Sequence, residues 1–195
     1  MIVEVQPIPL AVDPVALAGR AGLSLAEAEA ALAQARRQLS PAACFEELRP
    51  EELLPPELVA LRPWGETILA GLCSLGPDSG SPPADLPASL WAEITRLALR
   101  GVLDFLEYRL KLFLKPTGRQ PGPRLVPGCP ELPLEVNAAI LRLLGPEHSL
   151  RLTLNGRGGF DGGFGLAFVY PTLAWSAQAA GPCAACTRQD CPARI

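Results

Sequence analysis

Three cysteines close to the C-terminus have the spacing of a metal-ligand set. Cys183, Cys186 and Cys191 fall within the last thirteen residues, in the run CAACTRQDCPAR. Two cysteines separated by two residues chelate one metal ion easily, and a third can fold back to join them. The spacing therefore predicts zinc or an iron-sulfur cluster, and the alternative is a terminal tail with free thiols. The fourth ligand would be Cys44, Cys73, Cys129, the single histidine His148, or a molecule from outside the protein.

A glycine-rich segment, NGRGGFDGGFG, covers residues 155–165. Its spacing is neither G-x-G-x-x-G nor G-x-x-x-x-G-K-[ST], and a strand is expected after it, so no helix N-terminus could receive a phosphate. The composition predicts a flexible hairpin loop, because glycine marks positive φ or mobility. Close approach of its backbone to a flat cofactor is the alternative. The hydrolase motifs G-x-S-x-G and H-E-x-x-H are not found in the sequence.

The composition limits the classes of partner and compartment. The chain has 195 residues, 49% of them hydrophobic, with 17 Lys plus Arg against 20 Asp plus Glu. A formal net charge of -3 argues against nucleic acid as the main partner, since phosphate binding needs a surplus of basic side chains. The N-terminus has no basic region followed by an apolar run, and no apolar stretch suits a membrane span, so a cytoplasmic protein is expected.

The N-terminal quarter of the chain predicts a strand and two helices. Residues 2–9 suit a short edge strand, because they are partly β-branched and carry two prolines. Asp13 and Pro14 predict a helix start, with Gly19 or Gly22 as its end, and a capping box begins an amphipathic helix over 24–39. This pair resembles a helix-turn-helix, but its second helix opens with acidic residues, so we favour a structural helical hairpin over DNA binding.

The rest of the chain alternates strands and helices without a strict βαβ order. Cys44 and Cys73 are expected in the core. The expected elements are a loop with a short helix (47–65), a buried strand (67–76), a long helix (89–115), turns (116–133), a helix (134–144) and two strands (150–154, 164–170). This order predicts an α+β fold with a twisted antiparallel or mixed sheet and flanking helices. We expect one domain over 1–180, with an N-terminal helical part over about 1–62, and a tail over 181–195.

The segment RLVPGCPELP, from Arg124 to Pro133, is followed by the expected helix LEVNAAILRLL and the strand RLTL. It resembles the activation domain of cobalamin-dependent methionine synthase, where R-x-x-P-G-Y-P-x-x-P precedes a helix and a strand beginning L-T. The likeness extends to stand-alone homologues of this length that end in a cysteine-rich tail. Three other segments also fit this family: TILAGLCSLGP, the long helix through Glu107, and the N-terminal segment ending QLSPAACFEEL. The resemblance therefore covers most of the chain.

The resemblance implies a site for S-adenosylmethionine. Its residues would be Arg124, Pro127, Gly128 and Cys129, with Asp104 as the acidic contact from the long helix and Glu107 as the alternative. An arginine fork pairs with a carboxylate better than lysine does. Cys129 stands where the family has tyrosine, and the glycine-rich segment replaces a stretch that carries serines and a methionine.

Three functions follow from these patterns. The resemblance implies a reactivation partner of a corrinoid protein or of a methionine synthase without its own activation domain. A methyl group from S-adenosylmethionine and an electron from a flavodoxin-like reductant would restore methylcobalamin from cob(II)alamin. The alternative is an electron-transfer module on the same fold that holds a cluster or metal at Cys183, Cys186 and Cys191. The third possible function is that of a scaffold that only binds other proteins.

Overall fold

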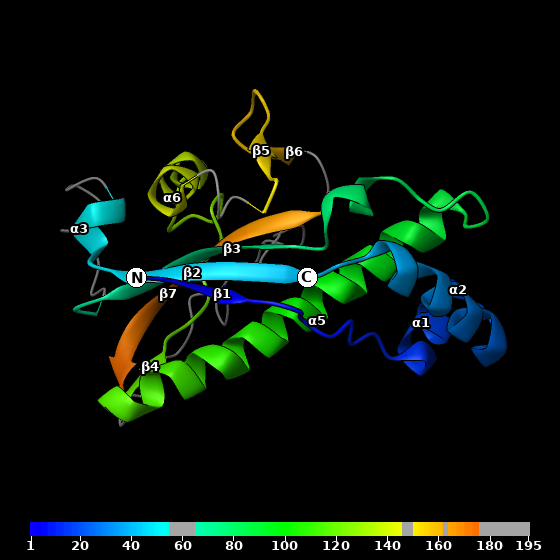
Figure 1. The fold of residues 1–195 in the computed structure, drawn as a ribbon, viewed down its shortest axis with the longest axis horizontal. Helices are drawn as coiled ribbons and strands as arrows, with labels where there is room; N and C mark the ends of the chain where they lie inside the picture. Colours follow the sequence, from blue (N-terminus) through cyan, green and yellow to red (C-terminus); the bar gives the residue numbers. More distant parts are fainter. Residues whose placement is uncertain (55–64, 146–149, 162–163, 176–195) are drawn as a thin grey trace.

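The computed structural model describes residues 1–54, 65–145, 150–161 and 164–175. These residues form an α+β fold built on a five-stranded sheet with the order β1-β2-β3-β7-β4, in which all neighbouring strands are antiparallel (Figure 1). Its strands are β1 Ile2–Val5, β2 Ala42–Leu48, β3 Ile68–Ser74, β4 Arg119–Pro121 and β7 Gly165–Ala174. The α-helices are α1 Pro14–Ala21, α2 Leu25–Gln38, α3 Pro50–Leu53, α5 Ala88–Leu114 and α6 Val136–Leu144. The predicted fold class is confirmed.

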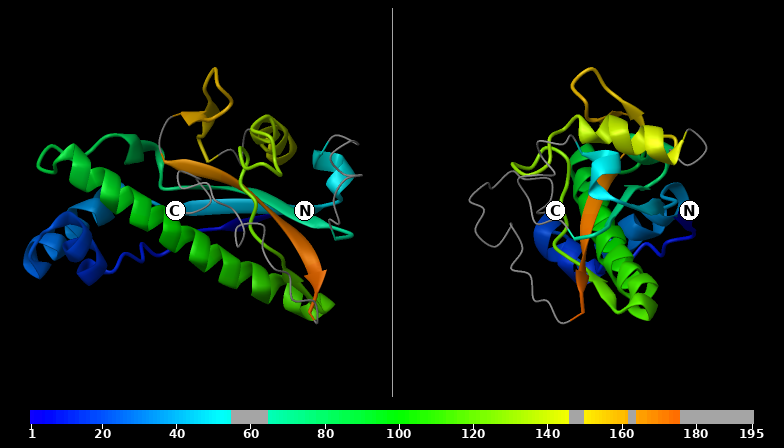
Figure 2. Two further views of the ribbon diagram at one scale, coloured as in Figure 1. Left: turned by 180° about the vertical axis from the view of Figure 1, so that it is seen from behind. Right: turned by 90° about the vertical axis from the view of Figure 1, so that its left-hand side faces the viewer.

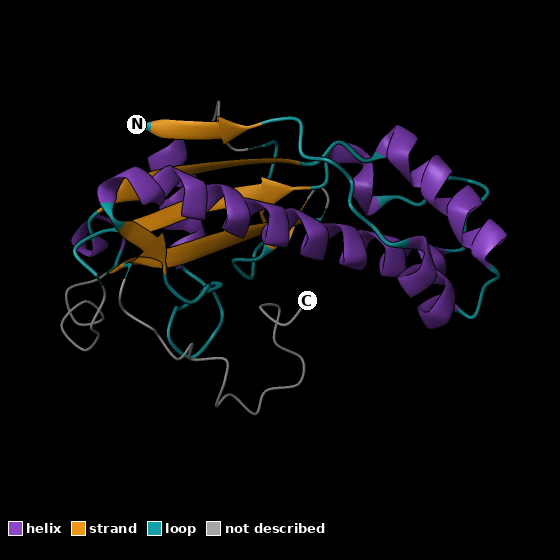
Figure 3. Cartoon of the chain, turned by 90° about the horizontal axis from the view of Figure 1, so that it is seen from below, coloured by secondary structure: helices purple, strands orange, loops and turns teal. Residues whose placement is uncertain are grey.

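One long helix, α5, covers one face of the sheet. It crosses the strands diagonally and continues past them to the helical pair α1 and α2 (Figure 3). Trp91, Ile94 and Leu103 belong to its apolar face, which is buried in one core together with Leu17 of α1 and Leu32 of α2. The apolar side of the pair thus packs on α5, in agreement with the structural interpretation of this hairpin.

The opposite face of the sheet carries α6 and a small hairpin. Figure 2 shows α6 and the strands β5 Thr153–Leu154 and β6 Phe160–Asp161 on the side away from α5. A second core forms here, and β3 serves both cores by alternation: Leu69 and Cys73 face the α5 side, whereas Ala70 and Leu72 face the α6 side. A central strand that is buried on both faces explains why its sequence is apolar throughout.

Local signals place the two N-terminal helices as expected. The Asp13 carboxylate accepts a hydrogen bond from the Val15 amide at 2.9 Å, and α1 ends at Gly22, whose φ is 67°. At α2 the Ser24 hydroxyl accepts from the Glu27 amide at 3.3 Å and the Glu27 carboxylate accepts from the Ser24 amide at 2.8 Å. This is the predicted capping box, and hydrogen bonds from Ser24 lower the pKa of Glu27.

Strand β2 was not predicted, and it corrects the view of the N-terminal part as helical. Its sequence AACFEEL contains no β-branched residue, so strand propensity alone gives little signal. Pairing supplies the stability instead, because β2 pairs with β3 along its whole length and with β1 over residues 43–46. Gly71 of β3 permits this close approach, since a Cβ there would collide with the Cys44 carbonyl and with Phe45. The short helix expected after β2 is present as α3.

The glycine-rich segment also differs from expectation. The strands expected on either side of it do not pair with each other: β5 pairs with β6 inside the segment, whereas β7 joins β3 and β4 in the main sheet. Among the described residues, no helix is long and apolar enough to cross a membrane.

Candidate functional site

The segment 124–129 lies at the edge of the sheet beyond β4. Leu125 forms an antiparallel bridge to Val169 of β7, with amide-to-carbonyl distances of 2.8 and 2.9 Å. Side chains of an extended segment alternate between faces, and Val126 belongs to the core on the α5 side whereas Leu125 belongs to the core on the α6 side. This alternation puts Arg124 on the α5 side of the sheet edge.

Arg124 lies there beside Tyr170, a fully buried residue of β7. Burial raises the pKa of Tyr170 above its usual value, and the guanidinium of Arg124 opposes that rise because it favours a nearby phenolate. Glu107 of α5 is also within electrostatic range and raises the same pKa. Of the predicted residues, Arg124 and Glu107 therefore both act electrostatically on this tyrosine.

Asp104, the first choice for the acidic contact, is exposed on α5 one turn before Glu107. Glu107 is half-buried, and its Oε1 accepts a hydrogen bond from Lys111 Nζ at 2.8 Å, which is the predicted i,i+4 pair. Because Glu107 affects the titration of Tyr170, it is the acid that the structure groups with Arg124.

Pro127, Gly128 and Cys129 form a tight turn on the α6 side. The Cys129 amide donates to the Val126 carbonyl at 3.0 Å, and the Gly128 amide donates to the Leu132 carbonyl at 2.7 Å. Gly128 has a φ of 96°, which a residue with a side chain rarely adopts. Pro127 is buried, and Cys129 is half-buried.

The tip of the β5–β6 hairpin lies next to this turn. A Cβ added at Gly128 or at Gly158 would lie within 3.5 Å of the Leu134 side chain, so both glycines flank that residue. Asn137 of α6 donates to the Gly158 carbonyl at 2.8 Å, and the Asn155 carboxamide accepts from the Gly159 amide at 3.0 Å. The turn and the hairpin thus adjoin each other on the α6 side of the sheet.

The predicted site is therefore divided by the sheet edge. Arg124 and Glu107 lie on the α5 side, and the turn with its glycine neighbours lies on the α6 side. A ligand that contacts both groups must lie across the edge formed by β4 and the segment after it.

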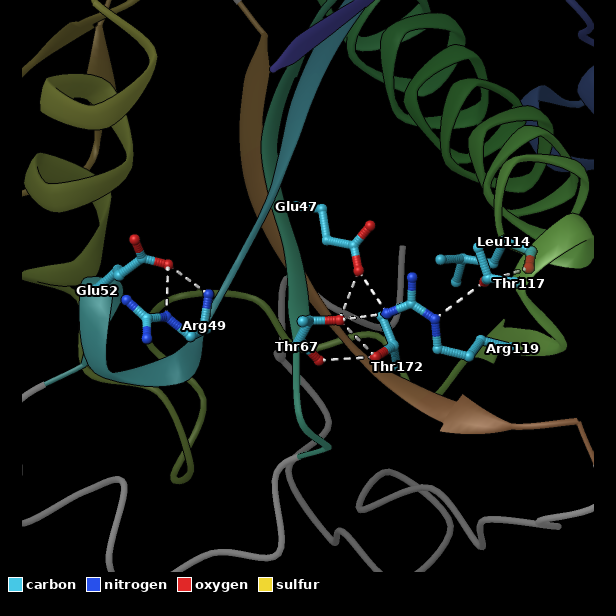
Figure 4. Close-up of polar contacts among 8 residues, drawn as sticks. All are labelled: Glu47, Arg49, Glu52, Thr67, Leu114, Thr117, Arg119 and Thr172. Atoms are coloured by element: carbon cyan, nitrogen blue, oxygen red, sulfur yellow. Dashed lines mark hydrogen bonds and ion pairs between the residues drawn. The ribbon is translucent and has the colours of Figure 1, made fainter.

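A polar cluster at the same end of the sheet was missed by the sequence analysis. Arg119 of β4 donates to the Glu47 carboxylate, to the Thr67 hydroxyl and, through Nε at 3.0 Å, to the Thr117 hydroxyl (Figure 4). Thr67 also donates to Glu47 at 2.7 Å. Burial raises the pKa of Glu47, but the hydrogen bonds from Arg119 and Thr67 outweigh it, so the net shift is downward. The cluster is satisfied internally and serves to join strands.

The thiols described by the structure are not activated. Burial raises the pKa of Cys44 and of Cys73 to about 12, and it also raises the pKa of Cys129. The thiolate is the form that binds metals and attacks electrophiles, so these groups are protonated at neutral pH. Among the described residues there is no group of three or more potential metal ligands. Cys183, Cys186, Cys191 and His148 lie outside the described residues.

Tyr170 and the Arg119 cluster are the polar features that sequence reasoning missed. A tyrosine within the apolar run LAFVY was the available signal, because a buried hydroxyl needs a polar neighbour. Comparison with models of known protein families gave no match, and a search of curated proteins found no similar sequence. The geometry of the site therefore carries the functional argument together with the resemblance of its motif.

Proposed function

We propose that this protein reactivates a cobalamin-dependent methyltransferase of the methionine synthase type. It would bind S-adenosylmethionine and cover the corrinoid of a partner protein during reductive methylation of cob(II)alamin. The observation that supports this most is the position of Arg124 beside Tyr170, with Glu107 within electrostatic range, at the sheet edge whose other face carries the Pro127–Cys129 turn. The partner is a corrinoid protein or a methionine synthase that lacks its own activation domain.

The described residues fit a zwitterionic ligand with an additional positive charge. The Arg124 guanidinium can pair with the carboxylate, and the Glu107 carboxylate can face the amino group or the sulfonium. The turn at Gly128 and the hairpin at Gly158 lie beside each other around Leu134, and Gly156 at the hairpin tip is exposed. In this role the chain binds and orients, whereas the ligand supplies the methyl group and a flavodoxin-like reductant supplies the electron.

The hairpin tip also suits contact with a flat corrin ring. A Cβ added at Gly156 would meet no atom within 4 Å, so this part of the backbone is open. A glycine tip allows the main chain to approach a planar surface without interference from side chains. This supports covering of the corrinoid by the α6 side of the molecule.

Calorimetry with the full chain tests the methyl-donor role. S-adenosylmethionine is titrated into the protein alone and into its mixture with a cob(II)alamin protein. Arg124→Gln should weaken binding roughly tenfold or more, because a charge-assisted pair is lost. Arg109→Gln removes an exposed arginine from α5 and should leave the affinity unchanged. No heat in either titration, for folded protein, removes the methyl-donor role.

We propose a metal or iron-sulfur electron-transfer module as the second candidate. It rests on the spacing of Cys183, Cys186 and Cys191. Anaerobically purified protein should contain iron or zinc, and a cluster should absorb visible light. Cys183→Ser should lower the metal content, whereas Thr187→Ala, a control in the same run that removes no candidate ligand, should not. Colourless protein with neither metal would exclude this candidate.

A further inference from the structure

A pocket lies at the other end of the sheet from the candidate site. Its volume is about 1080 Å³, which is ample for a small-molecule ligand. Its walls come from the segment after β1, the end of α2, the start of β2, the end of β3 with the segment after it, and the residues just before β5; they include Pro7, Pro9, Arg36, Ser74, Gly76 and Arg151.

Strand register separates this pocket from the site around Arg124. Ser74 pairs with Ala42 and with Gly165 at the pocket end of the sheet. Tyr170 pairs with Leu69 near the far end of β3. The pocket is therefore a second location, and its function does not depend on the proposed reaction.

Two arginines give the pocket a positive charge. Arg36 belongs to the last turn of α2, and Arg151 precedes β5; both side chains are exposed. No aspartate or glutamate is among the described residues that line the pocket. Neither arginine forms an ion pair with any residue that the structure describes. Both guanidinium groups can therefore bind an anion without giving up an internal partner.

The backbone around the pocket is held in unusual conformations. Leu150 and Arg151 have φ values of 53° and 59°, although neither is glycine. Consecutive positive φ values in residues with side chains are uncommon, and such strain concentrates at ligand sites. Gly76 has a φ of 104°, and a Cβ there would lie 2.6 Å from the Ser40 hydroxyl oxygen. Glycine thus keeps this wall of the pocket open.

The other walls combine a hydroxyl with apolar surface. The buried Ser74 hydroxyl accepts a hydrogen bond from the Gly76 amide at 3.0 Å, which leaves its own proton for an acceptor. Ile8, Leu39 and the rings of Pro7 and Pro9 provide an apolar wall without side-chain donors. The pocket therefore offers charge at one part and apolar contact at another.

We propose that this pocket binds a phosphate monoester that carries an apolar or aromatic body. Two guanidinium groups match a monoester, whose charge at pH 7 is about -1.5 to -2. A carboxylate carries a single charge and would leave one arginine without an ionic partner. The apolar body lies against the exposed rings of Pro7 and Pro9, and inorganic phosphate alone lacks that contact.

Calorimetry at low ionic strength with phenyl phosphate as the probe tests this proposal. Phenyl phosphate should bind, and inorganic phosphate and benzoate should bind at least roughly tenfold more weakly. Arg36→Gln and Arg151→Gln should each weaken binding of phenyl phosphate roughly tenfold. Affinity should also fall between pH 7 and pH 5, because the monoester takes up its second proton with a pKa near 6.

Arg37→Gln is the matched control, because Arg37 is the next residue on α2 and does not line this pocket. It should change the affinity less than about twofold, since only a general charge effect remains. Absence of phenyl phosphate binding would overturn the proposal. Equal losses in Arg36→Gln and Arg37→Gln, or equal binding of benzoate, would overturn it as well. All variants alter exposed side chains, and circular dichroism checks that they are folded.

Discussion

The two ends of the sheet use arginine in opposite ways. At the β4 end, Arg119 is about three-quarters buried and is hydrogen-bonded to Glu47, Thr67 and Thr117. At the pocket end, Arg36 and Arg151 are exposed and have no ion pair within the described part of the chain. Paired charge at the first end holds strands together. Unpaired charge at the second contributes little to the fold and is available to a ligand.

The first prediction compares the two ends directly. Arg119→Met leaves the Glu47 carboxylate partly buried without its cation, so the free energy of unfolding should fall by about 2–3 kcal/mol. Arg36→Met removes an exposed charge and should change it by less than about 0.5 kcal/mol. Urea denaturation followed by circular dichroism measures both. Equal losses of unfolding free energy in the two variants would contradict the different roles of arginine at the two ends of the sheet.

The second prediction concerns two glycines with positive φ. Gly76→Ala should cost about 2 kcal/mol, because the new methyl group is strained by the backbone and approaches Ser40 as well. Gly22→Ala meets no atom within 4 Å and should cost about 1 kcal/mol from backbone strain alone. Thermal and urea unfolding of both variants measure the difference. A larger loss for Gly22→Ala would contradict the tight wall at the pocket.

Sequence reasoning worked where the interactions are local. The caps at Asp13 and Ser24 are completed within three residues, so their patterns are visible in a short window. The buried strand β3 and the long helix α5 were also predicted, because their apolar patterns are long and continuous. The motif around Arg124 predicts a ligand site, and that site stays a prediction.

Sequence reasoning failed where stability comes from residues that are far apart in the sequence. Strand β2 has a weak local signal and forms because β1 and β3 pair with it on both sides. Glu47 and Arg119 are separated by 72 positions, so no local pattern connects them. The grouping of Arg124 and Glu107 at Tyr170 likewise depends on how α5 crosses the sheet. Such contacts are set by tertiary packing rather than by local preference.

The third prediction uses pH to isolate the β4 end. The folded-state pKa of Glu47 is lowered from its usual 4.5, so its contribution to stability is present above that value. As the pH falls through the folded-state pKa, that contribution is lost. Glu47→Gln should therefore lower the free energy of unfolding by about 1 kcal/mol at pH 7, and the difference from wild type should disappear in acid.

Urea titrations of both proteins at pH 7, 5 and 3 make this measurement. Glu51→Gln, which removes an exposed carboxylate from α3, is the control and should show a smaller dependence on pH. A difference between Glu47→Gln and wild type that stays constant down to pH 3 would contradict the role of the Arg119 cluster.

The smallest stability effect is expected at Glu107, where binding should change more than folding. Its pair with Lys111 is between two side chains that are each over two-fifths exposed, so Glu107→Gln should cost at most about 0.5 kcal/mol. The same change should lower the pKa of Tyr170, because a neighbouring negative charge is removed. Affinity for S-adenosylmethionine should fall roughly tenfold.

Lys111→Gln separates these effects, because it breaks the same ion pair and keeps the Glu107 carboxylate. Its stability loss should equal that of Glu107→Gln, while binding of S-adenosylmethionine stays close to wild type. Equal losses of affinity in both variants would mean that the ion pair, rather than the carboxylate, supports the site. Loss of affinity in Glu107→Gln alone would assign the carboxylate to the ligand, because the two variants differ in which charge remains beside Tyr170.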